Sequence, residues 1–275
     1  MRRIRIIVLL LMVVFATVLA GCSQPQEQDP NPEQQKLRLK VGATAVPHAE
    51  ILEFVQPVLE EQGIVLEIVV FNDYVQPNLA LSQGQLDANF FQHIPYLEAF
   101  KSDHKLDLTA VGKVHIEPMG IYSSKITDIS QLPVGAQIAI PNDVSQVGRA
   151  LALLAKHQLI QLKEGVGVMG TVEDVVQNPL QLKITLLDAA TLPRVLNDPQ
   201  VNAAVINGNF ALEADLNPVE DAILLEDGDS PYANVLVVKT GRESEEVVQA
   251  LMEALQSEAV KQFIQERYQG AVLPV

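Results

Sequence analysis

Cysteine is almost absent from this chain of 275 residues, and basic residues are few. The single cysteine, Cys22, excludes a framework of disulfide bonds within the protein. There are 19 lysines and arginines against 34 aspartates and glutamates, a formal net charge of −15 at pH 7. Because phosphate binding needs a basic surface, this balance argues against nucleic acid as a partner. The 48% of hydrophobic residues excludes a disordered chain and predicts one large or two medium globular units.

Motifs of the common enzyme classes are also missing. The sequence has no G-x-S-x-G, no H-E-x-x-H and no P-loop. GVGVMG at 165–170 matches G-x-G-x-x-G, but a predicted helix precedes it where a dinucleotide site needs a strand, so we interpret it as a surface loop. The five histidines show no metal-binding spacing, and Cys22 precedes the predicted fold. We therefore expect neither an enzyme, nor a metal, nor a cofactor.

The N-terminus has the pattern of an export signal. Arg2, Arg3 and Arg5 precede fifteen uncharged residues at 6–20, a run that is short for a bilayer span of about 20 residues. The run ends in LAGC at 19–22. An ordinary signal peptide with an incidental cysteine, or a short membrane anchor, are the alternative interpretations.

The residues around Cys22 resemble a bacterial lipobox. This resemblance implies cleavage before Cys22 and attachment of acyl chains to it, which would anchor the protein firmly to a membrane. Removal of residues 1–21 takes away three arginines and no acid, leaving 16 basic and 34 acidic residues and a formal charge of −18. Residues 23–36 carry no apolar side chain. We therefore predict that residues 22–36 form a flexible tether with a reach of roughly 20 Å. We expect a location in the cell envelope, on the extracytoplasmic side.

The remaining residues alternate between strand and helix patterns. Strands are predicted at 37–42, 64–71, 87–91 and 106–115, with helices at 47–62, 75–83 and 94–102 between them. This order predicts βαβ units and a parallel sheet. The pattern restarts near residue 120, and two crossing points are predicted at 118–119 and 230–231. We therefore predict one lobe from residues 37–118 and 232–275 and a second lobe from residues 119–231.

Polar and aromatic side chains gather where predicted strands end. Ligands of open α/β sheets bind beyond the carboxyl ends of the strands, so these side chains are candidates for one shared cleft. Arg149 fits a bidentate clamp on a carboxylate or, alternatively, a surface arginine with a packed stem. Asn207 and Asn234 suit the polar groups of a zwitterion, or are turn residues. An aromatic wall suits a thioether, although core packing explains aromatic residues equally well. The candidates are Tyr74, Phe91, His93, Tyr96, Arg149, Asn207 and Asn234, with Asn142 less certain.

Taken in order, the sequence resembles the MetQ/NlpA family of methionine-binding lipoproteins over essentially its whole length. The matching words are VGAT (41–44), PHAEIL (47–52), FNDYVQPN (71–78), DAN (87–89), FQH (91–93), PY (95–96), AIPND (139–143), GR (148–149), AVIN (204–207), SPY (230–232) and Asn234. The resemblance implies an α/β, two-lobed type II periplasmic-binding-protein fold with a ligand cleft between the lobes. It also implies that the seven candidate residues hold methionine or a close analogue, with Asn142 in a supporting position.

The resemblance further implies that the protein delivers methionine to an ABC permease and its ATPase. We expect the protein to be a monomer. The sequence departs from the family pattern at Phe210, where relatives often have tyrosine. We expect the loss of this hydroxyl to alter selectivity among L-methionine, D-methionine and methionine peptides. The alternatives are a protein of the same fold that binds D-methionine, a methionine dipeptide or another small apolar amino acid. A different class of function is a surface adhesin or interaction lipoprotein built on the same fold.

Overall fold

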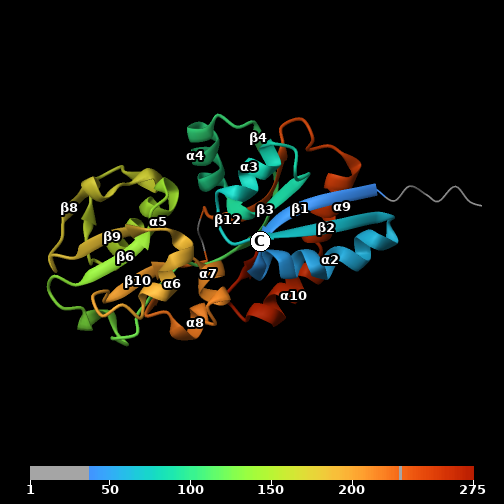
Figure 1. Cartoon of the computed structure of the whole chain (residues 1–275). Coiled ribbons are helices and arrows are strands. Elements are labelled where there is room, and N and C mark those ends of the chain that lie inside the picture. Colours follow the sequence, from blue (N-terminus) through green and yellow to red (C-terminus); the bar gives the residue numbers. More distant parts are fainter. Residues whose placement is uncertain (1–36, 229–230) are drawn as a thin grey trace, which may run out of the picture. The chain divides into compact units, whose positions relative to one another are not determined.

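The computed structural model describes residues 37–228 and 231–275, so the predicted signal, the lipidation site at Cys22, the tether and Ser230 lie outside the described residues. The N-terminal and C-terminal parts of the described chain together build a six-stranded sheet of order β13-β4-β12-β3-β1-β2 (Figure 1). Its strands are β1 (Leu37–Thr44), β2 (Ile64–Phe71), β3 (Ala88–His93), β4 (Leu108–Ile116), β12 (Ala233–Lys239) and β13 (Leu273–Pro274). Its helices are α2 (Glu50–Glu61), α3 (Gln76–Ser82), α4 (Ile94–His104), α9 (Glu246–Leu255) and α10 (Glu258–Tyr268).

Apolar periodicity explains how these helices cover the six-stranded sheet. On β1, Leu39, Val41 and Ala43 are completely buried, and they share a core cluster with apolar residues of α2, α9 and α10. A separate cluster joins Leu81 of α3 and Leu97 of α4 to the sheet. Helices therefore cover both faces of the sheet, and the candidate residues Phe91, His93 and Asn234 lie at the ends of β3 and β12.

A second sheet of five strands has the order β11-β5-β10-β6-β9. Its strands are β5 (Gly120–Tyr122), β6 (Gln137–Pro141), β9 (Lys183–Leu187), β10 (Ala203–Ile206) and β11 (Leu224–Leu225). Its helices are α5 (Val144–Lys156), α6 (Leu192–Val195), α7 (Gly208–Glu213) and α8 (Pro218–Asp221), and β7 (Gln161–Leu162) pairs with β8 (Val175–Gln177) beside it. Apolar residues of α5 pack in one core cluster with this sheet, and those of α6 and α7 pack in another.

The predicted α/β class is confirmed, but the prediction of a parallel sheet is wrong for part of each sheet. β1 pairs in parallel with β2 and β3, whereas β12 pairs antiparallel with β3 and β4. In the second sheet β10 is parallel to β6 and antiparallel to β5. The chain enters β12 from β11 of the second sheet and not from a crossover helix of the first. β12 is therefore not part of a βαβ unit, and the rule that makes the strands of such units parallel does not apply to it.

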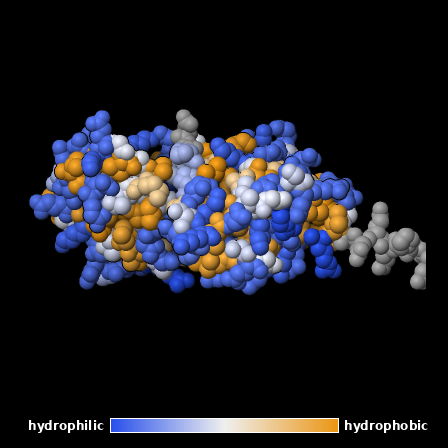
Figure 2. All heavy atoms as spheres, turned by 90° about the horizontal axis from the view of Figure 1, so that it is seen from above, coloured by the Kyte–Doolittle hydropathy of each residue, from blue (hydrophilic) through white to orange (hydrophobic). Residues whose placement is uncertain are grey.

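Hydrophilic residues cover much of the face shown in Figure 2, with apolar side chains between them. Within the described ranges, no helix is both long and apolar enough to cross a bilayer. Two connections run between the sheets: residues 117–119 join β4 to β5, and residues 226–232 join β11 to β12. The candidate site lies beside both connections.

Candidate functional site

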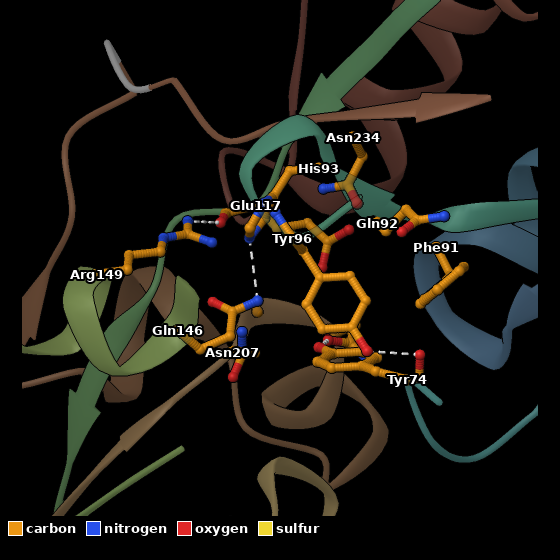
Figure 3. A pocket seen from close by; sticks show the side chains of 12 residues that line it. Tyr74, Phe91, Gln92, His93, Tyr96, Glu117, Gln146, Arg149, Asn207 and Asn234 are labelled. Carbon is orange, nitrogen blue, oxygen red and sulfur yellow. Dashed lines mark hydrogen bonds between the residues drawn. The ribbon is translucent and has the colours of Figure 1, made fainter. Parts of the chain in front are cut away.

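A pocket lies among residues of strands β3 and β12, helices α4 and α5, and the segments that follow β2, β4 and β10. Figure 3 shows side chains from β3, β12, α4 and α5, from the loops after β2 and β10, and from the connection at residue 117 around this pocket. The lining residues are Tyr74, Phe91, Gln92, His93, Tyr96, Glu117, Gln146, Arg149, Asn207, Gly208, Asn209 and Asn234. All seven of the main residues predicted from the sequence are among them.

Asn142 lies outside this pocket. It is exposed, and it lines a neighbouring cavity together with Tyr74, Tyr96 and Phe210. Phe210 is 4% exposed, and its ring centroid lies 4.9 Å from that of Tyr74. Asn142 and Phe210 therefore line a neighbouring cavity that shares Tyr74 and Tyr96 with the pocket.

Three aromatic rings form one wall of the pocket. The ring centroid of Tyr74 lies 6.0 Å from that of Phe91 and 5.8 Å from that of Tyr96. The Tyr96 hydroxyl donates to the Tyr74 carbonyl oxygen over 2.7 Å, which fixes the two residues together. His93 begins α4, and its Nδ1 accepts the Tyr96 backbone N–H over 3.1 Å. These rings are therefore held in place by contacts within the protein.

Arg149 lies in the second turn of α5, and Asp143 caps that helix by accepting the Gln146 N–H. The guanidinium is held on two sides. Its Nε donates to the two Glu226 carboxylate oxygens over 3.1 and 3.2 Å, and its Nη2 donates to Glu226 and, over 2.7 Å, to the Glu117 carbonyl oxygen. The Tyr232 ring centroid lies 4.3 Å from its central carbon. Arg149 therefore contacts both connections between the sheets, and within 37–228 and 231–275 no partner of its Nη1 is recorded.

Several buried polar atoms at the pocket have no hydrogen-bond partner. They are Oε1 of Gln146, Oδ1 of Asn207 and Nδ2 of Asn209. Leaving such atoms unpaired costs about 1–3 kcal/mol each, so the pocket is prepared for a ligand that brings both donors and acceptors. Amide orientations follow from the hydrogen-bond pattern, and either orientation leaves donors and acceptors facing the pocket.

Glu117 is the carboxylate among the lining residues, and it is 5% exposed. Its Oε1 lies 2.7 Å from Nε2 of His115 and 3.1 Å from Nε2 of His48. Burial raises the pKa of Glu117, while His48, Arg149 and the Asn209 backbone N–H act in the opposite direction. Burial lowers the pKa of His48 to about 4 and that of His115 to about 3, so both imidazoles are neutral at pH 7.

The same three residues are the metal-ligand grouping found in the described part of the chain. Nitrogen and oxygen ligands about 2.0–2.1 Å from Zn²⁺ lie about 3.4 Å apart in a tetrahedral site. The 2.7 and 3.1 Å separations here are hydrogen-bond distances instead. We therefore interpret the group as a hydrogen-bonded cluster around a carboxylate.

Residues that the sequence analysis missed form much of the polar lining: Gln92, Glu117, Gln146 and Asn209, with Glu226 behind Arg149. Two of them had a local signal. Gln146 lies three residues before Arg149 on one helical face, and Asn209 lies two residues after Asn207. Glu226 follows a short strand, but nothing in the sequence joins it to an arginine 77 positions earlier.

Comparison with known proteins adds independent findings. A family model described as NlpA lipoprotein matches residues 39–275. The chain is 42% identical over 262 residues to the D-methionine-binding lipoprotein MetQ of Salmonella typhimurium, covering 95% of this chain and 94% of that protein. A nutrient binding protein from Burkholderia cenocepacia bound to methionine has 45% identity and a TM-score of 0.82, covering 86% of this chain and 99% of that one. A periplasmic substrate-binding protein of an ABC transporter from Coxiella burnetii has 42% identity and a TM-score of 0.82, covering 86% of this chain and all of that one (100%).

Proposed function

The chain belongs to the NlpA lipoprotein family, and from this premise we propose that it captures methionine for an ABC importer and delivers it to the membrane permease. The observation that carries the proposal is the pocket itself. It combines a fixed guanidinium, buried amide groups without partners and an aromatic wall. These features match the carboxylate, the polar backbone groups and the thioether chain of methionine. The function is capture and delivery, with no chemical turnover.

Each part of methionine has a proposed partner in the pocket. Arg149 pairs with the carboxylate through Nη1, because its other donors are engaged with Glu226 and the Glu117 carbonyl oxygen. Asn207 and Asn234 fix the polar groups of the ligand backbone. Tyr74, Phe91, His93 and Tyr96 enclose the side chain, where sulfur gains from contact with aromatic rings. Glu117 is the acceptor for the ammonium group, since it is the buried carboxylate among the lining residues.

We propose that two lobes, residues 37–118 with 232–275 and residues 119–231, close on the ligand by hinge motion at the two connections. Side-chain hydrogen bonds join the two sets of elements in the present arrangement. Tyr74 donates to Asn209. His93 Nε2 lies 3.0 Å from the Gln146 side-chain amide (Figure 3), and because His93 Nδ1 accepts the Tyr96 N–H, this nitrogen is the donor and the amide oxygen is the acceptor. Both bonds are made by residues that line the pocket, so closure and ligand contact involve the same side chains.

Ligand identity is tested with full-length protein in detergent. We expect native mass spectrometry of freshly purified protein to detect a retained ligand of methionine's mass. A competition panel of L-methionine, D-methionine, glycyl-methionine and leucine then ranks the alternatives. Leucine lacks the sulfur and is expected to bind more weakly. An empty protein that binds none of the four would reject the transport proposal and favour the surface adhesin.

We also propose that acyl chains on Cys22 hold the mature protein on the extracytoplasmic side of a membrane, as a monomer that meets its permease and ATPase there. The formal charge of −18 gives no basic patch for anionic lipid, so the acyl chains must provide the attachment. We expect Cys22→Ala to move the protein from the membrane fraction to the soluble fraction and to prevent normal processing. Unchanged fractionation of this variant would remove the anchor from the proposal.

A further inference from the structure

The two buried histidines behind the pocket converge on one carboxylate oxygen. His48 lies in the irregular turn Ala45–Ala49 after β1, and His115 lies on β4. They are 1% and 0% exposed, and neither lines the pocket. Their Nε2 atoms nevertheless both approach Oε1 of Glu117, at 3.1 and 2.7 Å. Glu117 is therefore the side chain that links both histidines to the pocket, and His48 also contacts the lining residue Asn234.

The hydrogen-bond pattern assigns the proton of each imidazole to Nε2. Nδ1 of His48 lies 2.7 Å from the Thr44 hydroxyl, which can donate to it, and its Nε2 faces two acceptors, Glu117 Oε1 and Asn234 Oδ1. Nδ1 of His115 is buried without a partner. A proton placed there would be a buried, unpaired donor, which is costly, so the proton belongs on Nε2 facing Glu117. Both imidazoles thus donate N–H bonds to the same oxygen.

Formal charges around the pocket leave one negative charge without a fixed partner. Arg149 and Glu226 form an ion pair, which cancels the two charges. Glu117 is then the remaining acidic side chain of this group. Burial raises its pKa, and the contacts that favour its ionised form are those with the two imidazole N–H groups and the charge of Arg149. A zwitterion leaves the total unchanged and places its ammonium near Glu117. A carboxylate without an ammonium would add a second uncompensated negative charge to a buried site, which is strongly unfavourable.

We propose that His48 and His115 are positioning residues that hold the Glu117 carboxylate ionised and aimed at the pocket, so that the site accepts only ligands with a free, protonated amine. The inference rests on the proposed capture of methionine and names the chemical class within it. N-acylated amino acids and deaminated acids are excluded even when they carry the same thioether chain. Burial and the charge of Glu117 raise the pKa of Glu213 on α7, whereas the charge of Arg149 acts to lower the pKa of Glu117.

The test compares two ligands that differ by one ammonium group, L-methionine and 4-(methylthio)butanoate, by calorimetry on full-length protein in detergent. Wild-type protein is expected to prefer methionine by on the order of 100-fold, the scale of an unpaired buried charge. Glu117→Gln keeps the shape and removes the charge, and the preference should fall to about tenfold or less. His115→Leu removes one donor and should act in the same direction.

The conservative variant His115→Gln separates positioning from packing. A glutamine amide can place an N–H close to the former Nε2, so we expect this variant to recover most of the preference that His115→Leu loses. His104→Gln, at the exposed end of α4, is the matched control and should keep the wild-type preference. A purely structural role for the histidines would weaken both ligands alike and leave their ratio unchanged.

The outcomes separate this inference from the proposed function. If wild-type protein binds neither ligand, methionine capture itself fails. If it binds methionine but prefers it over 4-(methylthio)butanoate by less than about tenfold, the inference fails and the capture proposal remains. An unchanged preference in Glu117→Gln or in His115→Leu also overturns the inference. Should the histidine variants not fold, the wild-type preference and Glu117→Gln still decide it.

Discussion

Replacing Arg149 by alanine is expected to weaken methionine binding by about 2–5 kcal/mol, which is on the order of 30- to 4,000-fold in Kd. The arginine is 4% exposed, so the carboxylate that it pairs with is shielded from water. Without it, the ligand carboxylate would be buried with no cation, next to Glu117 and Glu226. The loss therefore includes both the missing bonds and the cost of leaving these anions unpaired. Isothermal titration calorimetry on protein freed of ligand by dialysis measures it.

Two further variants serve as controls for the Arg149→Ala measurement. Arg149→Lys keeps the charge but not the planar fork, so it should recover only part of the affinity. Arg242→Ala is the matched control: this arginine also pairs with carboxylates, those of Asp87 and Glu245, but it does not line the pocket. It should bind methionine as wild type does. Wild-type affinity in a correctly folded Arg149→Ala protein would remove the carboxylate clamp from the proposed site.

Substituting Gly148 by alanine is expected to destabilise the protein, although the residue lies inside a helix. Glycine to alanine in a helix normally gains up to about 1 kcal/mol. Here, a Cβ on Gly148 would lie 2.2 Å from the Val168 carbonyl oxygen and 2.9 Å from the Gly170 backbone N. These are backbone atoms of the glycine-rich loop, which cannot rotate away as a side chain can. Overpacking of this kind costs about 1–3 kcal/mol, and we expect it to outweigh the gain in helix propensity.

The same substitution should reduce methionine affinity, because displacement of α5 at Gly148 moves the adjacent Arg149. Thermal unfolding followed by circular dichroism measures the stability, with about 2–4 °C expected per kcal/mol for a protein of this size. Ala152→Ser adds one atom to an exposed position of the same helix and should change neither property. An equal or higher melting temperature in Gly148→Ala would show that the loop gives way without cost. The glycine-rich loop at 165–170 therefore packs its backbone closely against α5 at Gly148.

Several features of the site could be read from local sequence. Arg149 was recognisable because it interrupts an otherwise apolar helix just after a strand, and the aromatic residues because they follow apolar strands. Polar residues at strand ends are brought together by any open α/β sheet, so seven pocket residues could be predicted. Asn142 satisfied the same rule, yet it is exposed and points to a neighbouring cavity. The direction of a side chain at a strand end depends on packing that the rule does not contain.

Other features have no local signal because they depend on contacts between distant residues. Glu226 reaches Arg149 from 77 positions away, and His48 reaches Asn234 from 186 positions away. The three histidines His48, His93 and His115 are scattered in the sequence. Burial is the largest cause that lowers their pKa values, to about 4 for His48 and about 3 for the other two. Antiparallel pairing of β12 likewise follows from the route of the chain between the sheets.

The sequence by itself determined the lipobox-like N-terminus, the α/β class and most of the side chains that line the pocket. Each of these is written in neighbouring residues: an apolar run before Cys22, alternating strand and helix periods, and polar groups after strands. Only the tertiary structure decided which charges are paired. It placed Glu226 on Arg149 and two neutral histidines on Glu117. Charge state depends on burial and on partners brought together by packing, and neither is set by residues adjacent in the chain.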